Sequence, residues 1–227
     1  MAPAELLAAD PENKWLARGP RHRLAAEQIR DSALAAAGLL SGRVGGTSAR
    51  PYQPAGLWEE AGTGKSYTPD KGEGLYRRSL YTFWRRTAPP PTMLTFDATS
   101  REVCTAKRES TATPLQSLVL LNDPQYVEAA RVLAERIIAK HPTDTTAQVE
   151  AVVLTVLGRS PTPRERQILE DLYARQRSWF QDHPDEAARL LTVGEKPRQE
   201  TQPADATAAL AVVTATCLNH DEFVMKR

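Results

Sequence analysis

The sequence has little of what several classes of protein require. Its 227 residues include two cysteines and four scattered histidines, too few for a disulfide framework, a four-cysteine zinc site or a histidine cluster. The sequence also has no excess of charge of either sign, since it contains 29 Lys and Arg and 28 Asp and Glu. This balance excludes the overall basic character of a general nucleic-acid-binding protein. We therefore expect neither a metal site nor a nucleic-acid partner.

Long apolar runs are also lacking. No stretch approaches the roughly 20 residues of a membrane helix, so we expect no membrane span. The first residues, Met1 to Glu5, lack the basic and apolar regions of a signal peptide. No Cys-x-x-Cys-His motif occurs, so the chain cannot attach a c-type haem and we expect no cofactor in it. What remains, 41% hydrophobic and 25% charged residues, is typical of a globular protein.

Explicit helix starts mark the second half of the chain. Thr113 and Thr162 each precede a proline and stand three residues before Gln116 and Glu165, which is the capping-box pattern. Asp123 also caps a proline-led segment. With apolar spacing, these signals predict helices over 114–122, 123–140, 145–157, 163–180 and 205–219. The residues expected in the core between 114 and 139 are Leu118, Leu121, Val127, Leu133 and Ile137.

The first half is less regular. Apolar spacing predicts a helix within 14–41, ended by Gly42, and residues 43–74 are rich in Gly, Pro, Thr and Ser. Such a long irregular stretch is usually functional, packed against a neighbour or disordered. Residues 75–88 place Tyr76, Leu80, Phe83 and Trp84 on one helical face, with a strand as the alternative, before Pro89–Pro91 end the element. The fold class is therefore all-α or mostly α, with a long irregular Gly/Pro-containing segment in its N-terminal half.

The run Gly62–Ser66 resembles the end of a phosphate-binding loop. The motif needs a glycine five positions before Gly64, but that position holds Glu59, and no helix pattern follows. A carboxylate is electrostatically unfavourable beside a phosphate. We therefore interpret this run as a flexible glycine loop that does not bind nucleotide.

Arginines and aromatic residues are concentrated between 75 and 110, where seven basic and three acidic residues leave a net charge of +4. Arginines beside Tyr and Trp can hold anions bidentately or stack on the rings. The candidate ligand- or partner-binding residues are Arg77, Arg78, Trp84, Arg85, Arg86, Asp97, Arg101, Glu102 and Arg108. In the alternative interpretation, the aromatic residues are core and these arginines pair with acidic side chains and with buried carbonyl groups.

The cysteines and histidines allow more than one interpretation. Cys104 and Cys217 could bridge, but sequence separation says nothing about their distance. Asn219–Glu222 carries ligand-type side chains that point in different directions on a helix, so a polar helix terminus is favoured over a joint site.

A series of motifs occurs in a recognisable order along the chain. They are LARGPRHRL at 16–24, AEQIRD at 26–31, YRRSLYTFWR at 76–85, PPP at 89–91, FDA at 96–98, REVC at 101–104, TPLQ at 113–116, LLNDP at 120–124, LN at 218–219 and DEF at 221–223. Together they resemble the planctomycete-specific domain found at the C-terminal end of large exported proteins, which often also carry a cytochrome-c-type domain. The resemblance spans residues 13–227.

The resemblance implies a C-terminal portion of a larger exported or periplasmic protein, with haem only in an upstream domain. Residues 1–112 would form an N-terminal helix plus the irregular segment and residues 113–227 part of a helical bundle, together one structural domain. Its expected partners are the upstream domains of such a protein. The favoured function is a non-catalytic accessory module that binds a partner domain or an anionic ligand. The alternatives are an enzyme acting on acidic or sulfated polysaccharide and a docking module for a cytochrome-c-type domain.

Overall fold

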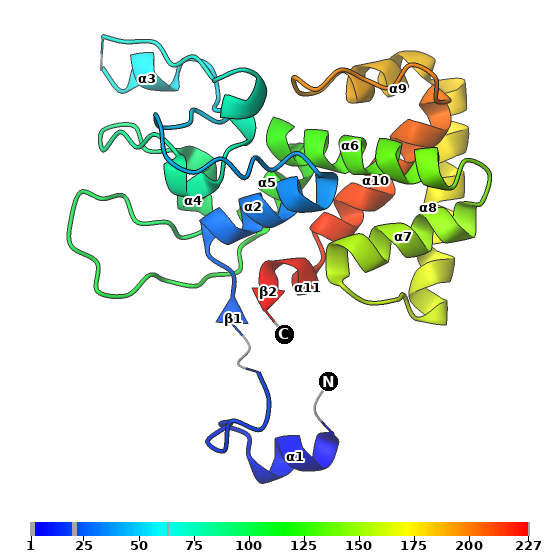
Figure 1. Cartoon of the computed structure of the whole chain (residues 1–227), viewed down its shortest axis with the longest axis horizontal. Helices are drawn as coiled ribbons and strands as arrows, with labels where there is room; N and C mark the ends of the chain where they lie inside the picture. Colours follow the sequence, from blue (N-terminus) through cyan, green and yellow to red (C-terminus); the bar gives the residue numbers. More distant parts are fainter. Residues whose placement is uncertain (1–2, 20–21, 63, 227) are drawn as a thin grey trace.

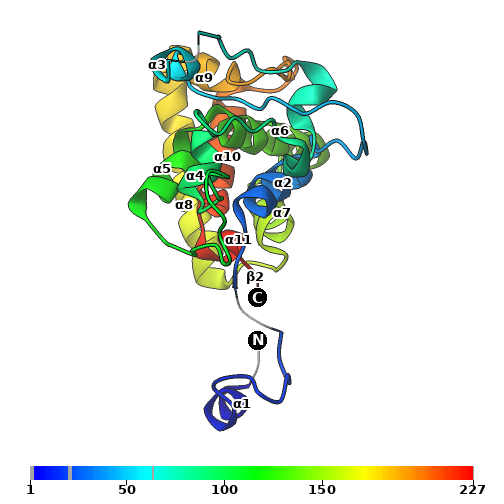
Figure 2. The ribbon, with the colours of Figure 1, turned by 90° about the vertical axis from the view of Figure 1, so that its left-hand side faces the viewer.

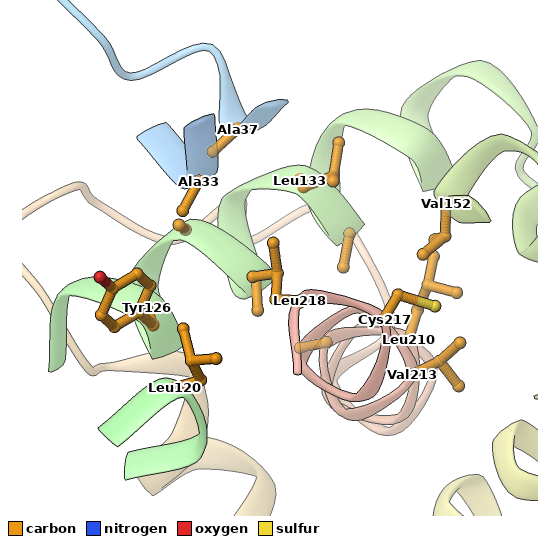
Figure 3. Close-up of a cluster of buried hydrophobic side chains, with 14 of the residues drawn as sticks. Ala33, Ala37, Leu120, Tyr126, Leu133, Val152, Leu210, Val213, Cys217 and Leu218 are labelled. Atoms are coloured by element: carbon orange, nitrogen blue, oxygen red, sulfur yellow. The ribbon is translucent and has the colours of Figure 1, made fainter. Parts of the chain in front are cut away.

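An alanine-rich helix, α10 (Ala204–Leu218), forms the centre of the helical half. Ten of its residues are buried, because four helices pack around it (Figure 1): α6 (Pro124–Lys140), α7 (Thr145–Leu157), α8 (Pro163–Asp182) and α9 (Pro184–Leu191). A helix that is apolar nearly all round needs such an environment. In the close-up of this core, Leu218 of α10 lies on the side of α6, and Leu210 and Cys217 lie toward Val152 of α7 (Figure 3).

The computed structural model describes residues 3–19, 22–62 and 64–226 and is mostly α-helical, as the sequence predicts. The elements in chain order are α1 (Ala4–Ala9), β1 (His22–Arg23), α2 (Ala26–Ala37), α3 (Leu57–Glu60), the 3-10 helices η1 (Gly72–Tyr76) and η2 (Ser79–Tyr81), α4 (Pro91–Thr95), α5 (Pro114–Asn122), α6 (Pro124–Lys140), α7 (Thr145–Leu157), α8 (Pro163–Asp182), α9 (Pro184–Leu191), α10, α11 (Asp221–Val224) and β2 (Met225–Lys226). The two short strands pair antiparallel, with His22 opposite Lys226.

The arrangement separates regular from irregular structure. The segment 38–112, with α3 and α4, gathers at one end of the molecule beside α2, and α7, α8 and α9 lie at the other end (Figure 1). Helix α1 stands apart from the rest in both views (Figures 1 and 2). No helix in the described ranges combines the length and the apolar character that a membrane crossing needs.

The predicted helix starts after residue 112 are confirmed. The hydroxyl of Thr113 accepts from the Gln116 amide at 3.4 Å and that of Thr162 from the Glu165 amide at 3.3 Å, while Asp123 accepts from the Gln125 amide at 3.0 Å. These are local interactions between residues two or three positions apart, so the sequence contains all their determinants.

Two of the leucines predicted in the core are exposed instead. Leu118 is 55% and Leu121 is 41% exposed, whereas Gln116 and Leu120 are buried and Leu133 and Ile137 are buried as predicted. Gln116 and Leu120 are four residues apart, so they share one face of α5, and this face packs on the neighbouring elements. Leu118 is two positions from each of them and therefore lies on the opposite face. On α8, Ile168 and Trp179 are likewise exposed.

The helix predicted within 14–41 is shorter than expected. The carboxylate of Asp10 accepts from the backbone amides of Lys14 and Trp15, and Asn13 and Leu16 have positive φ. Side chains that bond nearby backbone in this way compete with a helix. Helix α2 therefore begins at Ala26, and it ends at Ala37, before the left-handed Gly38.

The helix predicted over 75–88 is wrong, and so is the strand alternative. The 3-10 turns η1 and η2 form there, with isolated β-bridges at Arg77 and Thr82, and Leu80, expected on a buried face, is 74% exposed. The reason lies on α2, where buried Arg30 donates to the carbonyl oxygens of Leu75 and Arg77, each at 2.8 Å. These carbonyls are thus satisfied by a distant side chain rather than by a helix ladder.

Candidate functional site

Three of the candidate arginines line one pocket at the start of α2. This arginine pocket has a volume of about 390 Å³. Its lining residues are Ala25, Glu27, Gln28, Asp31, Arg78, Ser79, Leu80, Arg101 and Arg108. Helix α2 forms one wall, and two separate parts of the irregular segment, 78–80 and 101–108, provide the others.

Arg101 and Arg78 are positioned by aromatic rings. Arg101 has a left-handed backbone, with φ 65°, and its guanidinium carbon lies 4.7 Å from the ring centroid of Trp84. The Trp84 indole is itself fixed, because its Nε1 donates to the Ser100 carbonyl at 2.9 Å. The guanidinium of Arg78 lies 5.7 Å from the centroid of Tyr81, and its buried Nε has no hydrogen-bond partner among the described residues. Such stacking fixes each cation without neutralising it.

Arg108 is neutralised within the pocket. Its two terminal nitrogens donate to the two carboxylate oxygens of Glu27 at 2.7 and 3.0 Å. Burial acts to raise the pKa of Glu27, but the hydrogen bonds and charge of Arg108 outweigh it, and the pKa is lowered. Glu27 is therefore ionised at neutral pH.

The second carboxylate of the pocket is also engaged. Asp31 accepts from the backbone amide of Ser79 at 2.8 Å and from its hydroxyl at 2.7 Å, and it lies 3.5 Å from the guanidinium of Arg30. Three arginines and two carboxylates line the pocket. The formal charge of its lining is thus +1, and its two carboxylates already have donors.

The other candidate residues serve the backbone or stand elsewhere. Buried Arg77 donates to the carbonyl oxygens of Gly45 and Thr47 and lies over the Tyr81 ring. The Arg85 guanidinium lies 4.7 Å from the Trp58 ring centroid. Asp97, with φ 62°, accepts from the amide and hydroxyl of Thr111. Arg86 and Glu102 are exposed and do not line the pocket.

Three residues of α2 were missed by the sequence analysis. Glu27 and Asp31 line the pocket. Arg30 supports the pocket residue Ser79 by donating to its hydroxyl at 3.1 Å, and it also donates to the side-chain oxygen of Gln125 at 2.6 Å. One signal was present. Arg30 follows Ile29 within the apolar face of an amphipathic helix, where a charged residue needs a partner.

A second pocket has fewer charged side chains in its lining. It has a volume of about 640 Å³ and lies between α4, α5 and the segment 52–54. Its largely apolar lining includes the exposed Leu115 and Leu118. Its carboxylate, Asp123, accepts from the Thr92 hydroxyl at 2.6 Å and from the Gln125 amide. We call it the leucine groove.

The remaining motifs do not form a site in the described part of the chain. Cys104 is exposed and Cys217 is buried, and neither is bridged. His220 caps α11, which agrees with the predicted polar helix terminus. Within residues 3–19, 22–62 and 64–226 no group of three or more His, Cys, Asp or Glu side chains is placed to hold a metal ion. In the glycine loop, Gly62 and Gly64 have positive φ, and Thr63 lies outside the described residues.

Comparison with known proteins gives a match to a protein family. A family model described as a protein of unknown function, DUF1553, matches residues 1–173. No curated protein and no solved structure matches the chain.

Proposed function

Because the chain belongs to the DUF1553 family, whose function is unknown, its role has to be inferred from its own residues, and we propose that it is a non-catalytic binding module. In this proposal the arginine pocket holds an acidic segment of a partner domain. The observation that carries it is the convergence of Arg78, Arg101 and Arg108, from two separate segments, on one open pocket.

The free cations support an acidic ligand. Within the described ranges neither Arg78 nor Arg101 forms an ion pair, and each is held in place by an aromatic ring. A guanidinium presents parallel N–H groups that match the two oxygens of a carboxylate. Two such groups held on fixed rings lose less conformational entropy on binding than free side chains do.

The surroundings favour a protein segment over a polysaccharide. Leu80 stands exposed in the pocket lining and offers an apolar contact beside the arginines. By contrast, arginines already lie over the rings of Trp58, Tyr81 and Trp84, on which a sugar would stack. A pocket with arginines and an exposed leucine has the mixed character of a protein interface.

The polysaccharide-enzyme alternative has less support. Glycoside hydrolysis needs a pair of carboxyl groups at the scissile bond. Glu27 and Asp31 are engaged by Arg108 and by Ser79, and Asp97 is engaged by Thr111. The resemblance described above makes an upstream domain of the same exported protein the expected partner. Docking of a cytochrome-c-type domain would be one form of this interaction.

Titration with a fluorescein-labelled decaglutamate peptide tests the proposal. We expect saturable binding that weakens about tenfold in Arg78→Gln and in Arg101→Gln, as loss of a charge-assisted contact implies. Arg86→Gln is the matched control, because Arg86 is exposed and lies outside the pocket lining. Unfolding midpoints of all three variants report whether the fold survives.

Two results would overturn the proposal. One is the absence of saturable binding, and the other is an equal loss in Arg86→Gln. Titration with a sulfated polysaccharide forms the second arm of the experiment. If it binds through Arg78 and Arg101 and the peptide does not, the polysaccharide alternative replaces the acidic-segment proposal.

A further inference from the structure

The Glu27–Arg108 pair has the geometry that a bound carboxylate would have. Both oxygens of Glu27 accept from the two terminal nitrogens of Arg108, in the bidentate arrangement by which arginine recognises acidic ligands. Both side chains line the pocket and are 28% and 41% exposed, so the pair is open to solvent. An incoming carboxylate can thus reach the same guanidinium.

We propose that Glu27 is an internal occupant of the anion site, and that a carboxylate of the partner's acidic segment displaces it from Arg108. This inference rests on the proposed function. Arg78 and Arg101 make the first contacts, since neither forms an ion pair within the described residues. Arg108 then exchanges one carboxylate for another.

The exchange has a consequence for selectivity. Because Glu27 must be released, Arg108 contributes to the binding free energy only the difference between two similar ion pairs. A ligand with a single carboxylate therefore gains little affinity from Arg108. A segment with several carboxylates binds Arg78 and Arg101 first, and its next carboxylate then competes with Glu27 at a high effective concentration. The pocket therefore selects clustered acidic residues over isolated ones.

A purely structural role for Glu27 predicts something different. Glu27 lies in the first turn of α2, where a negative charge stabilises the helix dipole. The pair also connects the exposed loop that carries Arg108 to α2. If these were its only roles, removal of Glu27 would lower stability and leave the affinity for peptide unchanged.

Five variants and the decaglutamate peptide separate these roles. We expect Glu27→Gln to bind the peptide about fivefold more tightly, as loss of a half-exposed competing ion pair implies. Glu27→Asp keeps the negative charge and its interaction with the helix dipole. The shorter aspartate side chain does not reach Arg108 in the bidentate geometry, so we expect this variant also to bind the peptide more tightly than the wild type. Glu150→Gln is the matched control, because it removes a similarly exposed pair with Arg166 on α7 and α8. In an Arg108→Gln background, Glu27→Gln brings no gain.

The outcomes are distinguishable from failure of the proposed function. If Arg78→Gln weakens binding but Glu27→Gln and Glu27→Asp do not strengthen it, the displacement is wrong and the binding module stands. A gain from Glu27→Gln that persists in the Arg108→Gln background reflects only the removed charge and also overturns the displacement. If neither the wild type nor Glu27→Gln binds the peptide, both proposals fail.

Discussion

The phenol of Tyr76 donates a 2.7 Å hydrogen bond to Oε1 of Glu128, a fully buried carboxylate on α6. The same carboxylate accepts from the Tyr52 phenol at 3.1 Å and from the backbone amide of Lys196 at 2.7 Å. Burial and the hydrogen bond to Glu128 raise the pKa of Tyr76, so its phenol is a protonated donor at neutral pH. The Glu128 carboxylate thus connects three segments to the helical core: two parts of the irregular segment, through Tyr52 and Tyr76, and the loop before α10, through Lys196.

Removal of the Tyr76 hydroxyl should be more destabilising than removal of a phenol that donates to a neutral group. We expect Tyr76→Phe to lower the free energy of unfolding by about 1.5–3 kcal/mol, the range for a hydrogen bond to a charged acceptor. Tyr67→Phe is the control, since Tyr67 donates at 2.6 Å to the neutral Pro51 carbonyl, and its loss should be about 1 kcal/mol. Urea unfolding measures both, and an equal loss in the two variants would contradict the role given to Glu128.

Gly194 should tolerate no side chain. Its φ is +92°, and a Cβ there would lie 2.2 Å from Cδ of Glu128, which three donors hold in place. We expect Gly194→Ala to lower the unfolding free energy by about 3 kcal/mol or more, through backbone strain and a clash. Gly158→Ala is the matched control, because φ is +71° there but no atom lies close to the added Cβ. Backbone strain alone should lower its unfolding free energy by about 1 kcal/mol. Similar losses in the two variants would show that the loop moves away from Glu128.

Acid should weaken the contact between the start of α8 and α11. Hydrogen bonds from Arg159, which also binds Glu222, lower the pKa of Glu165 from 4.5 to about 2. The stability from this carboxylate is complete above pH 4.5, where the unfolded chain is also ionised, and it is lost as the pH falls toward 2. Because both side chains are about one-third exposed, the contribution is about 1 kcal/mol or less.

The variant Glu165→Gln isolates this effect. Between pH 5 and pH 2, we expect its unfolding free energy to decrease less than that of the wild type in urea titrations. Glu200→Gln is the control, since Glu200 is exposed and forms no ion pair in the described part of the chain. Identical pH profiles for Glu165→Gln and the wild type would rule out the coupling to Arg159.

The two thiols should differ sharply in reactivity. Cys104 is exposed, whereas burial raises the pKa of Cys217 to about 12, so almost no Cys217 thiolate exists at pH 8. A thiol-reactive disulfide reagent at pH 8 should label one cysteine in the native protein, none in Cys104→Ser and two after denaturation. Rapid native labelling of Cys104→Ser would mean that α10 opens readily.

Local determinants made the helical half predictable. Thr113, Asp123 and Thr162 cap helices through residues two or three positions away, and apolar spacing identified α6, α7 and α10. The density of arginines and aromatic residues between 75 and 110 identified a segment from which three arginines line the arginine pocket. These features depend on neighbours in the chain, and a sequence displays them directly.

Tertiary structure decided what the irregular segment does. Residues 75–88 form no α-helix, because distant groups satisfy their carbonyl oxygens: Arg30 donates to those of Leu75 and Arg77, and the amides of Ser41 and Ala49 donate to those of Tyr76 and Tyr81. Leu118 is exposed because the opposite side of α5 packs on its neighbours, and Arg108 has a partner because the start of α2 places Glu27 beside it. A hydrogen bond between distant residues depends on how the helices pack, and no pattern within a short stretch of sequence contains that information.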